Sequence, residues 1–265
     1  MTDVVIAGIG QIPVGENYSQ DLRSMGVKAL LAALHDCGDL KPDALYIGNM
    51  LSSIISHQSN LGALFTDYAA LNGIESYAAE AAGASGAAAL RLATLAILSG
   101  YVDTAAVLGV EKYSDFVKTD AEAAIMQSLD YDYESLPGLT STSQAGLIMQ
   151  RYLHEYDLPA DALNGFTILA HANGKNNPNA IYRNTITTEA YSRASMISDP
   201  MNLYDGATYA DGAAALILTR RELLPAGYAH PIISVTGYGT SSDSLSWHDR
   251  HKPLAFKAAA RAVSD

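Results

Sequence analysis

Apolar and polar positions fall into a regular order over the first 111 residues. Short apolar runs at residues 3–9, 44–49 and 102–110 have the length and composition of buried strands. Around residues 27–34 and 61–68, apolar side chains instead recur three and four positions apart, which is typical of helices. With a further strand at the start of residues 74–111, strands and helices alternate. This order predicts a mainly parallel sheet with helices on both faces.

Three glycine and serine positions suggest where these predicted elements begin and end. Ser19 is a candidate N-cap for the first helix, and Gly38 is expected to stop it. Gly73 is expected to end the second helix.

Residues 74–111 form the unit around which the chain is arranged. The run from Ala87 to Ser99 is broken only by Arg91 and Thr94, and its leucines point to every side of a helix. A helix that is apolar all round is expected to lie inside a large fold. Before it stands a tight turn, where the positive end of the helix dipole can hold a developing negative charge. We therefore expect a binding site in this turn, formed by Gly83, Ala84, Ser85 and Gly86.

The composition becomes polar and turn-rich after residue 111, and we therefore divide the chain into four segments. Residues 1–111 form the α/β core, and residues 112–205 are polar, turn-rich and too long for a simple connection. We interpret 112–205 as an inserted loop lobe with one clear helix at 142–156. The apolar pattern of 211–219 predicts a return strand within 206–230. Residues 231–265 complete the chain.

The last segment resembles the first one. A shift of 229 positions places Gly8 on Gly237 and Gly10 on Gly239, and it carries the end of 254–263 onto the first predicted helix. This match predicts an internal duplication, of which 231–265 is the start of the second copy. On this interpretation the second copy stops after one strand and one helix.

Composition narrows the classes of function. The 28 carboxylates outnumber the 16 lysines and arginines, giving a net charge of −12, and no basic run occurs. These features argue against nucleic-acid and membrane binding. No apolar run reaches the roughly 18 residues of a membrane span, and the N-terminus lacks the basic region of a signal peptide. A single cysteine fits a reducing compartment, so we expect a soluble, cytoplasmic protein.

Several spaced motifs resemble the thiolase superfamily, in particular sterol-carrier-protein-X-type thiolases and thiolase-like steroid side-chain aldolases. The motifs are Val5–Pro13, Glu80–Leu90, Gly109–Lys112, Ile197–Asp205 and Ala210–Leu216. The resemblance implies a duplicated, layered α/β fold with a buried central helix, of which the second half is largely absent here. It also implies that the lobe contributes to an acyl-CoA site and that the protein forms a homodimer or a higher oligomer.

Gly83 departs from this family pattern. Condensing thiolases place a nucleophilic cysteine here, because the helix dipole favours a thiolate that accepts the acyl group. Glycine has no atom to acylate, and the family's other catalytic loops belong to the missing half. We therefore expect a non-acylating acyl-CoA-binding protein, without a further cofactor. It would cleave a carbon–carbon bond with a partner such as a small OB-fold acyl-CoA-binding protein.

Three other functions stay open at this point. The chain could be a catalytically inactive thiolase-like structural subunit, or an acetyl-CoA acyltransferase as the family label alone would suggest. A serine hydrolase would use Ser85, with Asp199 and His230 or His248 completing a triad.

The cysteine, the clustered tyrosines and the segment 247–251 contain reactive side chains, and we expect them to have structural rather than catalytic roles. The one cysteine, Cys37, is interpreted as a structural thiol. The tyrosine pairs 131/133 and 204/209 are expected to pack the lobe or line an interface, with a proton-donor role as the alternative. The segment 247–251 has a metal-like composition but lacks ligand spacing, so we expect no metal.

Overall fold

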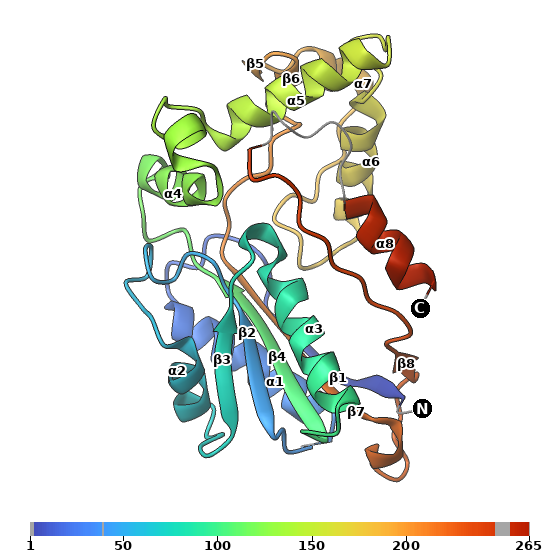
Figure 1. Cartoon of the computed structure of the whole chain (residues 1–265). Helices are drawn as coiled ribbons and strands as arrows, with labels where there is room; N and C mark the ends of the chain where they lie inside the picture. The colour runs from blue at the N-terminus through green and yellow to red at the C-terminus, as the bar shows by residue number, and fades with distance from the viewer. Residues whose placement is uncertain (1–2, 39, 247–254, 265) are drawn as a thin grey trace. The chain divides into compact units, whose positions relative to one another are not determined.

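The computed structural model describes residues 3–38, 40–246 and 255–264. The chain folds as two compact units, each visible in Figure 1. The core unit comprises residues 1–115, 211–241 and 254–265, and the lobe unit comprises residues 116–210 and 242–253. Among the described residues, no helix is long and apolar enough to cross a membrane.

The core unit is built on one mixed sheet. Within the described residues the sheet has six strands in the order β3-β2-β4-β7-β1-β8. β2 pairs in parallel with β3 and β4, whereas β7 is antiparallel to β4 and β1, and β8 is antiparallel to β1. β1, β2, β3 and β4 therefore run in one direction, which confirms the predicted fold class. The bounds are β1 (Val4–Gln11), β2 (Ala44–Gly48), β3 (Glu75–Ala79), β4 (Thr104–Glu111), β7 (Gly212–Arg220) and β8 (Ile233–Ser234).

Helices cover both faces of this sheet, as the alternation of elements predicted. Side chains along a strand point alternately to opposite faces. Leu45 and Ile47 accordingly pack in one cluster with α1 (Leu22–Asp36) and α2 (Leu61–Tyr68). Ala44 and Tyr46 pack in a second cluster with α3 (Ser85–Leu98). α3 thus packs against the face of the sheet opposite to α1 and α2 (Figure 1).

The predicted N-cap of the first helix is wrong by two residues. The Asp21 carboxylate, rather than Ser19, accepts the N–H of Ser24 at 2.8 Å and caps α1. Gly38 follows the helix with φ +75, a backbone conformation that glycine adopts at little cost. The second helix, α2, already ends at Tyr68, ahead of Gly73.

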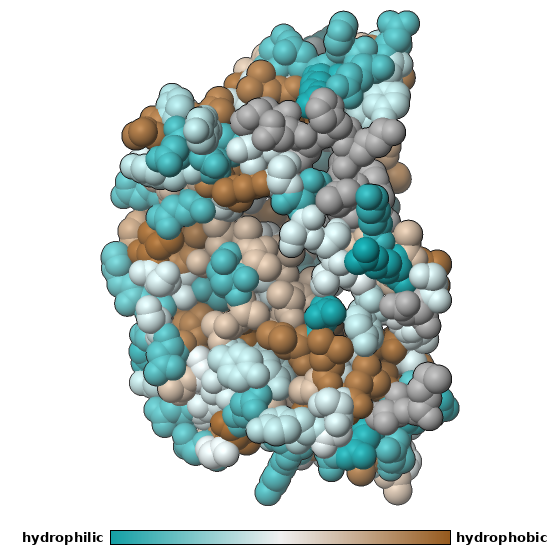
Figure 2. All heavy atoms as spheres, viewed as in Figure 1, coloured by the Kyte–Doolittle hydropathy of each residue, from teal (hydrophilic) through white to brown (hydrophobic). Residues whose placement is uncertain are grey.

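α3 differs from the expected helix buried on every side. One stripe, which includes Ala89, Ala93 and Ile97, is fully buried against the sheet. The other sides are partly exposed, and Leu98 at the end of the helix is 38% exposed. Figure 2 shows apolar residues gathered over this part of the core unit. The sequence pattern reports the apolar character of each side, but it does not say which sides have a neighbour.

The two matching glycine pairs make the same contacts. A Cβ added to Gly8 would collide with the carbonyl oxygen of Ala33, and one added to Gly10 would collide with that of Ala29. Near the end of the chain the glycines pack on α8 (Ala255–Ser264) in the same way. The corresponding contacts are Gly237 with Ala262 and Gly239 with Ala258. The same shift of 229 positions therefore relates both partners of each contact, which supports the predicted duplication.

The lobe unit is mainly helical. The predicted helix at 142–156 is present as α5, and Thr140 forms a capping box with Ser143 at its start. A short hairpin, β5 and β6, packs near α5, where Gly146 lies against Ser198. The bounds are α4 (Lys118–Ile125), α5 (Ser141–Glu155), α6 (Asn164–Lys175), α7 (Thr188–Ser192), β5 (Met196–Ser198) and β6 (Met201–Asn202). The remaining helical turns are η1 (Ala82–Ala84), η2 (Met126–Ser128), η3 (Tyr131–Ser135, a π-turn) and η4 (Arg221–Leu223).

Candidate functional site

The turn predicted to bind a ligand lies between β3 and α3. Gly83 belongs to the one-turn helix η1, and α3 follows directly at Ser85. Ala82 has φ +47, which is unfavourable for a residue with a side chain. Its N–H donates to the Glu80 carboxylate at 2.5 Å. A local network of hydrogen bonds therefore holds the strained backbone in place just before Gly83.

Ser85 is part of this network. Its hydroxyl accepts the N–H of Ala81 at 3.0 Å and donates to the carbonyl of Ala82 at 2.7 Å. The side chain is buried, and it closes the turn instead of capping the helix, because the N-cap position is Ala84. Ser85 thus supports the position of Gly83.

The hydrolase alternative does not fit these contacts. The Ser85 proton is donated to a backbone carbonyl, and the proposed base His230 pairs with Asp36 at 3.5 Å. Asp199 belongs to the lobe unit, and His248 lies outside the described residues. In the part of the chain that the structure describes, the Ser85 hydroxyl is thus hydrogen-bonded to backbone groups and to no histidine.

Gly83 and Gly48 are glycines for different reasons. A Cβ on Gly83 would meet nothing within 4 Å, and Gly83 is exposed. At the end of β2, by contrast, a Cβ on Gly48 would lie 2.6 Å from the Cα of Gly86. Gly48 therefore allows the start of α3 to touch the sheet, whereas packing does not require glycine at position 83.

A partly buried carboxylate lies at the same end of the neighbouring strand. Glu111 ends β4 and accepts the N–H groups of Met50 and Leu51 at 3.2 and 3.1 Å and the Asn49 amide at 2.9 Å. Burial raises the pKa of Glu111, although these hydrogen bonds oppose the shift. Crevices at the carboxyl ends of parallel strands commonly bind ligands. Glu111 fixes the loop that follows β2 at this edge.

Sequence reasoning missed a buried ionic cluster in the core unit. The Asp211 carboxylate accepts the N–H groups of Tyr113 and Asn17 at 2.7 and 2.8 Å, and the Ser114 hydroxyl at 2.6 Å. The Lys112 ammonium lies 3.3 Å from it, and both side chains are almost fully buried. Asp211 therefore links the β1–α1 loop to the end of β4. An aspartate directly before the apolar run 212–219 was the available signal.

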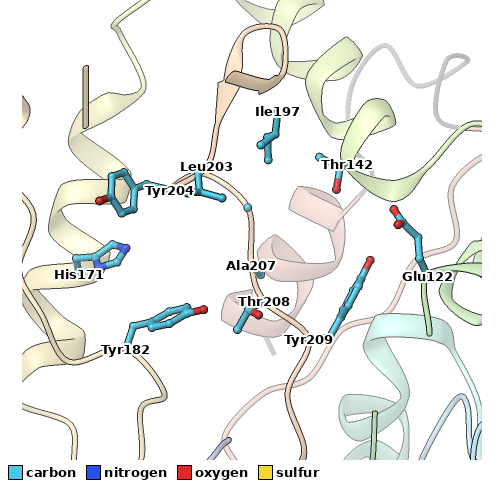
Figure 3. Close-up of a pocket in the computed structure, with 11 residues that line it drawn as sticks. Glu122, Thr142, His171, Tyr182, Ile197, Leu203, Tyr204, Ala207, Thr208 and Tyr209 are labelled. Atoms are coloured by element: carbon cyan, nitrogen blue, oxygen red, sulfur yellow. The ribbon is translucent and has the colours of Figure 1, made fainter. Parts of the chain in front are cut away.

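The lobe unit contains a cavity of about 450 Å³. Figure 3 shows His171, Tyr182 and Tyr204 on one side of it and Tyr209 and Glu122 on the other. Tyr204 and Tyr209 line the same cavity from opposite sides, whereas Tyr131 and Tyr133 are largely exposed and do not line it. Sequence reasoning did not single out His171, because nothing in its local pattern marks it.

Cys37 and the segment 247–251 are the other positions that the sequence singled out. Cys37 is 1% exposed, and its thiol donates to the carbonyl of Leu34, in agreement with a structural role. Residues 247–251 lie outside the described residues. In the part of the chain that the structure describes, no group of three histidine, cysteine or carboxylate side chains could hold a metal. A second cavity of about 380 Å³, lined mostly by residues with polar side chains, lies in the core unit between the end of β2, the start of α2 and β3.

Comparisons with known proteins agree with this architecture. The family model "Thiolase, N-terminal domain" matches residues 4–222. An acetyl-CoA acetyltransferase of Methanothermobacter thermautotrophicus is 34% identical, over 99% of this chain and 68% of its own. One of Methanocaldococcus jannaschii is 36% identical, over 98% of this chain and 66% of its own.

A solved structure shares the fold. The Ltp2-ChsH2(DUF35) aldolase superposes with a TM-score of 0.76 at 22% identity, covering 94% of this chain and 65% of its own. This chain therefore spans about two thirds of the length of the proteins it matches. From the family match and the two relatives, we conclude that the chain belongs to the thiolase family.

Proposed function

We propose that this chain binds an acyl-CoA thioester at the turn before α3 and does not form an acyl-enzyme at position 83. The observation that carries the proposal is Gly83 itself. It occupies the place where the resemblance to condensing thiolases puts the nucleophile, yet it has no side chain to acylate. The start of a 14-residue helix remains available to polarise a thioester carbonyl.

Two other nucleophiles, Ser85 in the turn and Cys37 on the opposite face of the sheet, do not replace the missing thiol. Ser85 directs its proton to a backbone carbonyl, and the thiol of Cys37 is buried and hydrogen-bonded. Stabilising an enolate beside a thioester needs a polarised carbonyl and a proton transfer, without a covalent bond to the protein. We therefore propose carbon–carbon bond cleavage beside the thioester as the reaction.

A partner subunit is part of the proposal. The structurally similar aldolase carries two components in its name. In this chain, the sides of α3 away from the sheet are partly exposed and apolar, and such a surface suits a protein contact. We propose that a second subunit, either another copy or a small OB-fold acyl-CoA-binding protein, contributes to the active assembly.

Acyl transfer from radiolabelled acetyl-CoA tests the proposal on the full chain. After an acid quench, the wild-type protein is expected to carry no label. Gly83→Cys is expected to gain label, because its thiol has room at a helix N-terminus. Gly83→Ala is the matched control and should stay unlabelled. Stoichiometric labelling of the wild-type chain would refute the proposal, and peptide mapping would then locate the true nucleophile.

Calorimetric titration with acetyl-CoA and longer acyl-CoA esters distinguishes the proposal from the alternative of a catalytically inactive structural subunit. Saturable binding to the wild-type chain is expected. A chain that binds no ester but still assembles with a partner would instead be a catalytically inactive structural subunit. The observation in favour of that alternative is the same Gly83, which removes the nucleophile without disturbing the fold.

A further inference from the structure

The lobe cavity has one wall made of aromatic rings. The rings of His171 and Tyr182 are nearly parallel, with 18° between their planes and 6.4 Å between their centroids. Tyr204 meets His171 edge to face, with centroids 5.7 Å apart. All three side chains line the cavity (Figure 3). This wall presents flat apolar surfaces with polar atoms at their edges.

The rest of the lining combines apolar and acceptor groups. Leu203 and Ile197 line the cavity while 58% and 43% exposed, respectively. Tyr209, Thr142 and the carboxylate of Glu122 stand opposite the aromatic wall (Figure 3). Exposed large apolar side chains around a hollow mark a binding site. The volume of about 450 Å³ also lies within the range of roughly 300–1,000 Å³ that is typical of small-molecule sites.

Partly buried hydrogen bonds hold part of this lining in place. The Asp205 carboxylate accepts the hydroxyls of Tyr191 and Thr167 at 2.8 and 2.7 Å and the N–H of Asn202 at 2.9 Å. The side-chain oxygen of Asn202 in turn accepts the N–H of Tyr204 at 2.8 Å. The segment that carries Leu203 and Tyr204 is thus tied to α6 and α7. Such preorganisation lowers the entropic cost of binding a ligand.

His171 offers an acceptor beside these rings. Its Nδ1 lies 3.1 Å from the backbone carbonyl of Asn184. Because a carbonyl oxygen only accepts, Nδ1 must carry the proton of this hydrogen bond. In the neutral ring, Nε2 is therefore an acceptor.

We propose that the lobe cavity binds a planar, uncharged ring that carries a hydrogen-bond donor. The aromatic wall suits stacking against a flat ring. The donor of the ligand would meet Nε2 of His171 or the Glu122 carboxylate, and the same carboxylate disfavours an anion. The described lining residues contribute no lysine or arginine that would offset this charge. The inference concerns the lobe unit alone and does not require a thioester at the turn before α3.

Fluorescence titration of the full chain with 2-naphthol tests the site. Tyr182→Leu and Tyr204→Leu are each expected to weaken binding about threefold to tenfold by loss of ring contacts. Tyr133→Leu is the matched control, because Tyr133 is 75% exposed and does not line the cavity. The anionic 2-naphthalenesulfonate is expected to bind more weakly than 2-naphthol, and Glu122→Gln should narrow that difference. For the wild-type chain, 2-methoxynaphthalene, which lacks the donor, should also bind more weakly.

Competition identifies where such a ring comes from. Displacement of 2-naphthol by 6-hydroxy-2-naphthoyl-pantetheine, whose ring keeps the donor, assigns the ring to an acyl group, and displacement by CoA assigns it to adenine. If neither compound displaces 2-naphthol, the ring site remains and is separate from the thioester site. The proposal is overturned if 2-naphthol does not bind saturably, or if it binds equally well to the wild type and to both cavity variants. Neither result bears on acyl-CoA binding by the core unit.

Discussion

Gly48→Ala tests how the fold positions the turn before α3. The added methyl group would lie 2.6 Å from both the Cα and the N of Gly86 and 2.7 Å from the carbonyl carbon of Ser85. All three are backbone atoms of the first turn of α3, so no side chain can rotate away. Because carbon atoms pack at about 3.5–4.0 Å, the helix start and the sheet must separate by roughly 1 Å.

The neighbouring strand provides a matched control for this change. Gly109 of β4 is the direct partner of Gly48 in the parallel ladder. A Cβ on Gly109 would meet only the carbonyl oxygen of Ala214, at an ordinary 3.9 Å. We expect Gly48→Ala to cost about 1–3 kcal/mol in the free energy of unfolding through overpacking. We expect Gly109→Ala to stay within about 0.5 kcal/mol of wild type.

Thermal unfolding followed by circular dichroism measures the difference. At about 2–4 °C per kcal/mol for a chain of this size, Gly48→Ala should unfold several degrees below Gly109→Ala. Hydrogen exchange should localise the damage, with faster exchange in the first turn of α3 than in β4. Equal midpoints for the two variants would show that Gly48 does not set the approach of α3 to the sheet.

Three further predictions concern the core unit. Asp211→Asn removes one of the two carboxylates that pair with the buried ammonium of Lys112, and the other, Asp115, remains. We therefore expect the free energy of unfolding at neutral pH to fall by at most about 3–5 kcal/mol, the cost of breaking a buried pair completely. Burial alone would raise the pKa of Asp211, but hydrogen bonds from Ser114, Asn17 and Tyr113 outweigh burial and lower it below 3.8. Its stabilisation is therefore complete above that value and is lost as the pH falls through the folded-state pKa, so acid titration of the unfolding midpoint should show a smaller loss in Asp211→Asn. Gly10→Ala and Gly239→Ala should both destabilise the chain in urea unfolding, because each methyl group would collide with a helix carbonyl, and an unchanged Gly239→Ala would contradict the repeated contact. Cys37 should react with a thiol reagent far more slowly in the native chain than in urea, and equal rates would contradict its burial.

The order of elements in the core unit was predictable because each buried element leaves a periodic apolar pattern. β1, β2, β4 and α1 were all predicted from such patterns, and β7 was recognised as the return strand. The helix start was less predictable, because Ser19 and Asp21 are both good caps and the apolar pattern does not say which of them precedes the first helical residue. Periodicity therefore identifies elements better than it places their ends.

The contacts that build the sites could not be predicted in the same way. Asp211 hydrogen-bonds Tyr113, which lies 98 positions away, and no local pattern encodes such a pairing. His171 likewise becomes notable only when α6 brings it beside Tyr182 and Tyr204. The burial of α3 was overstated for a related reason, since apolar character does not specify a neighbour. Long-range pairing is thus the part that the sequence alone leaves undetermined.

Packing does not require a glycine at position 83, whereas it does at position 48. Its φ lies outside the left-handed region, and a Cβ there would meet nothing within 4 Å. Gly83→Ala should therefore leave the free energy of unfolding unchanged or raise it by up to about 1 kcal/mol, because alanine restricts the unfolded chain. If a thioester carbonyl lies against this turn, the same methyl group should weaken acyl-CoA binding measured by calorimetry. Unchanged stability with weakened binding would identify Gly83 as a ligand-binding position, whereas lost stability would show that the turn requires glycine for folding. Unchanged affinity would place the thioester elsewhere.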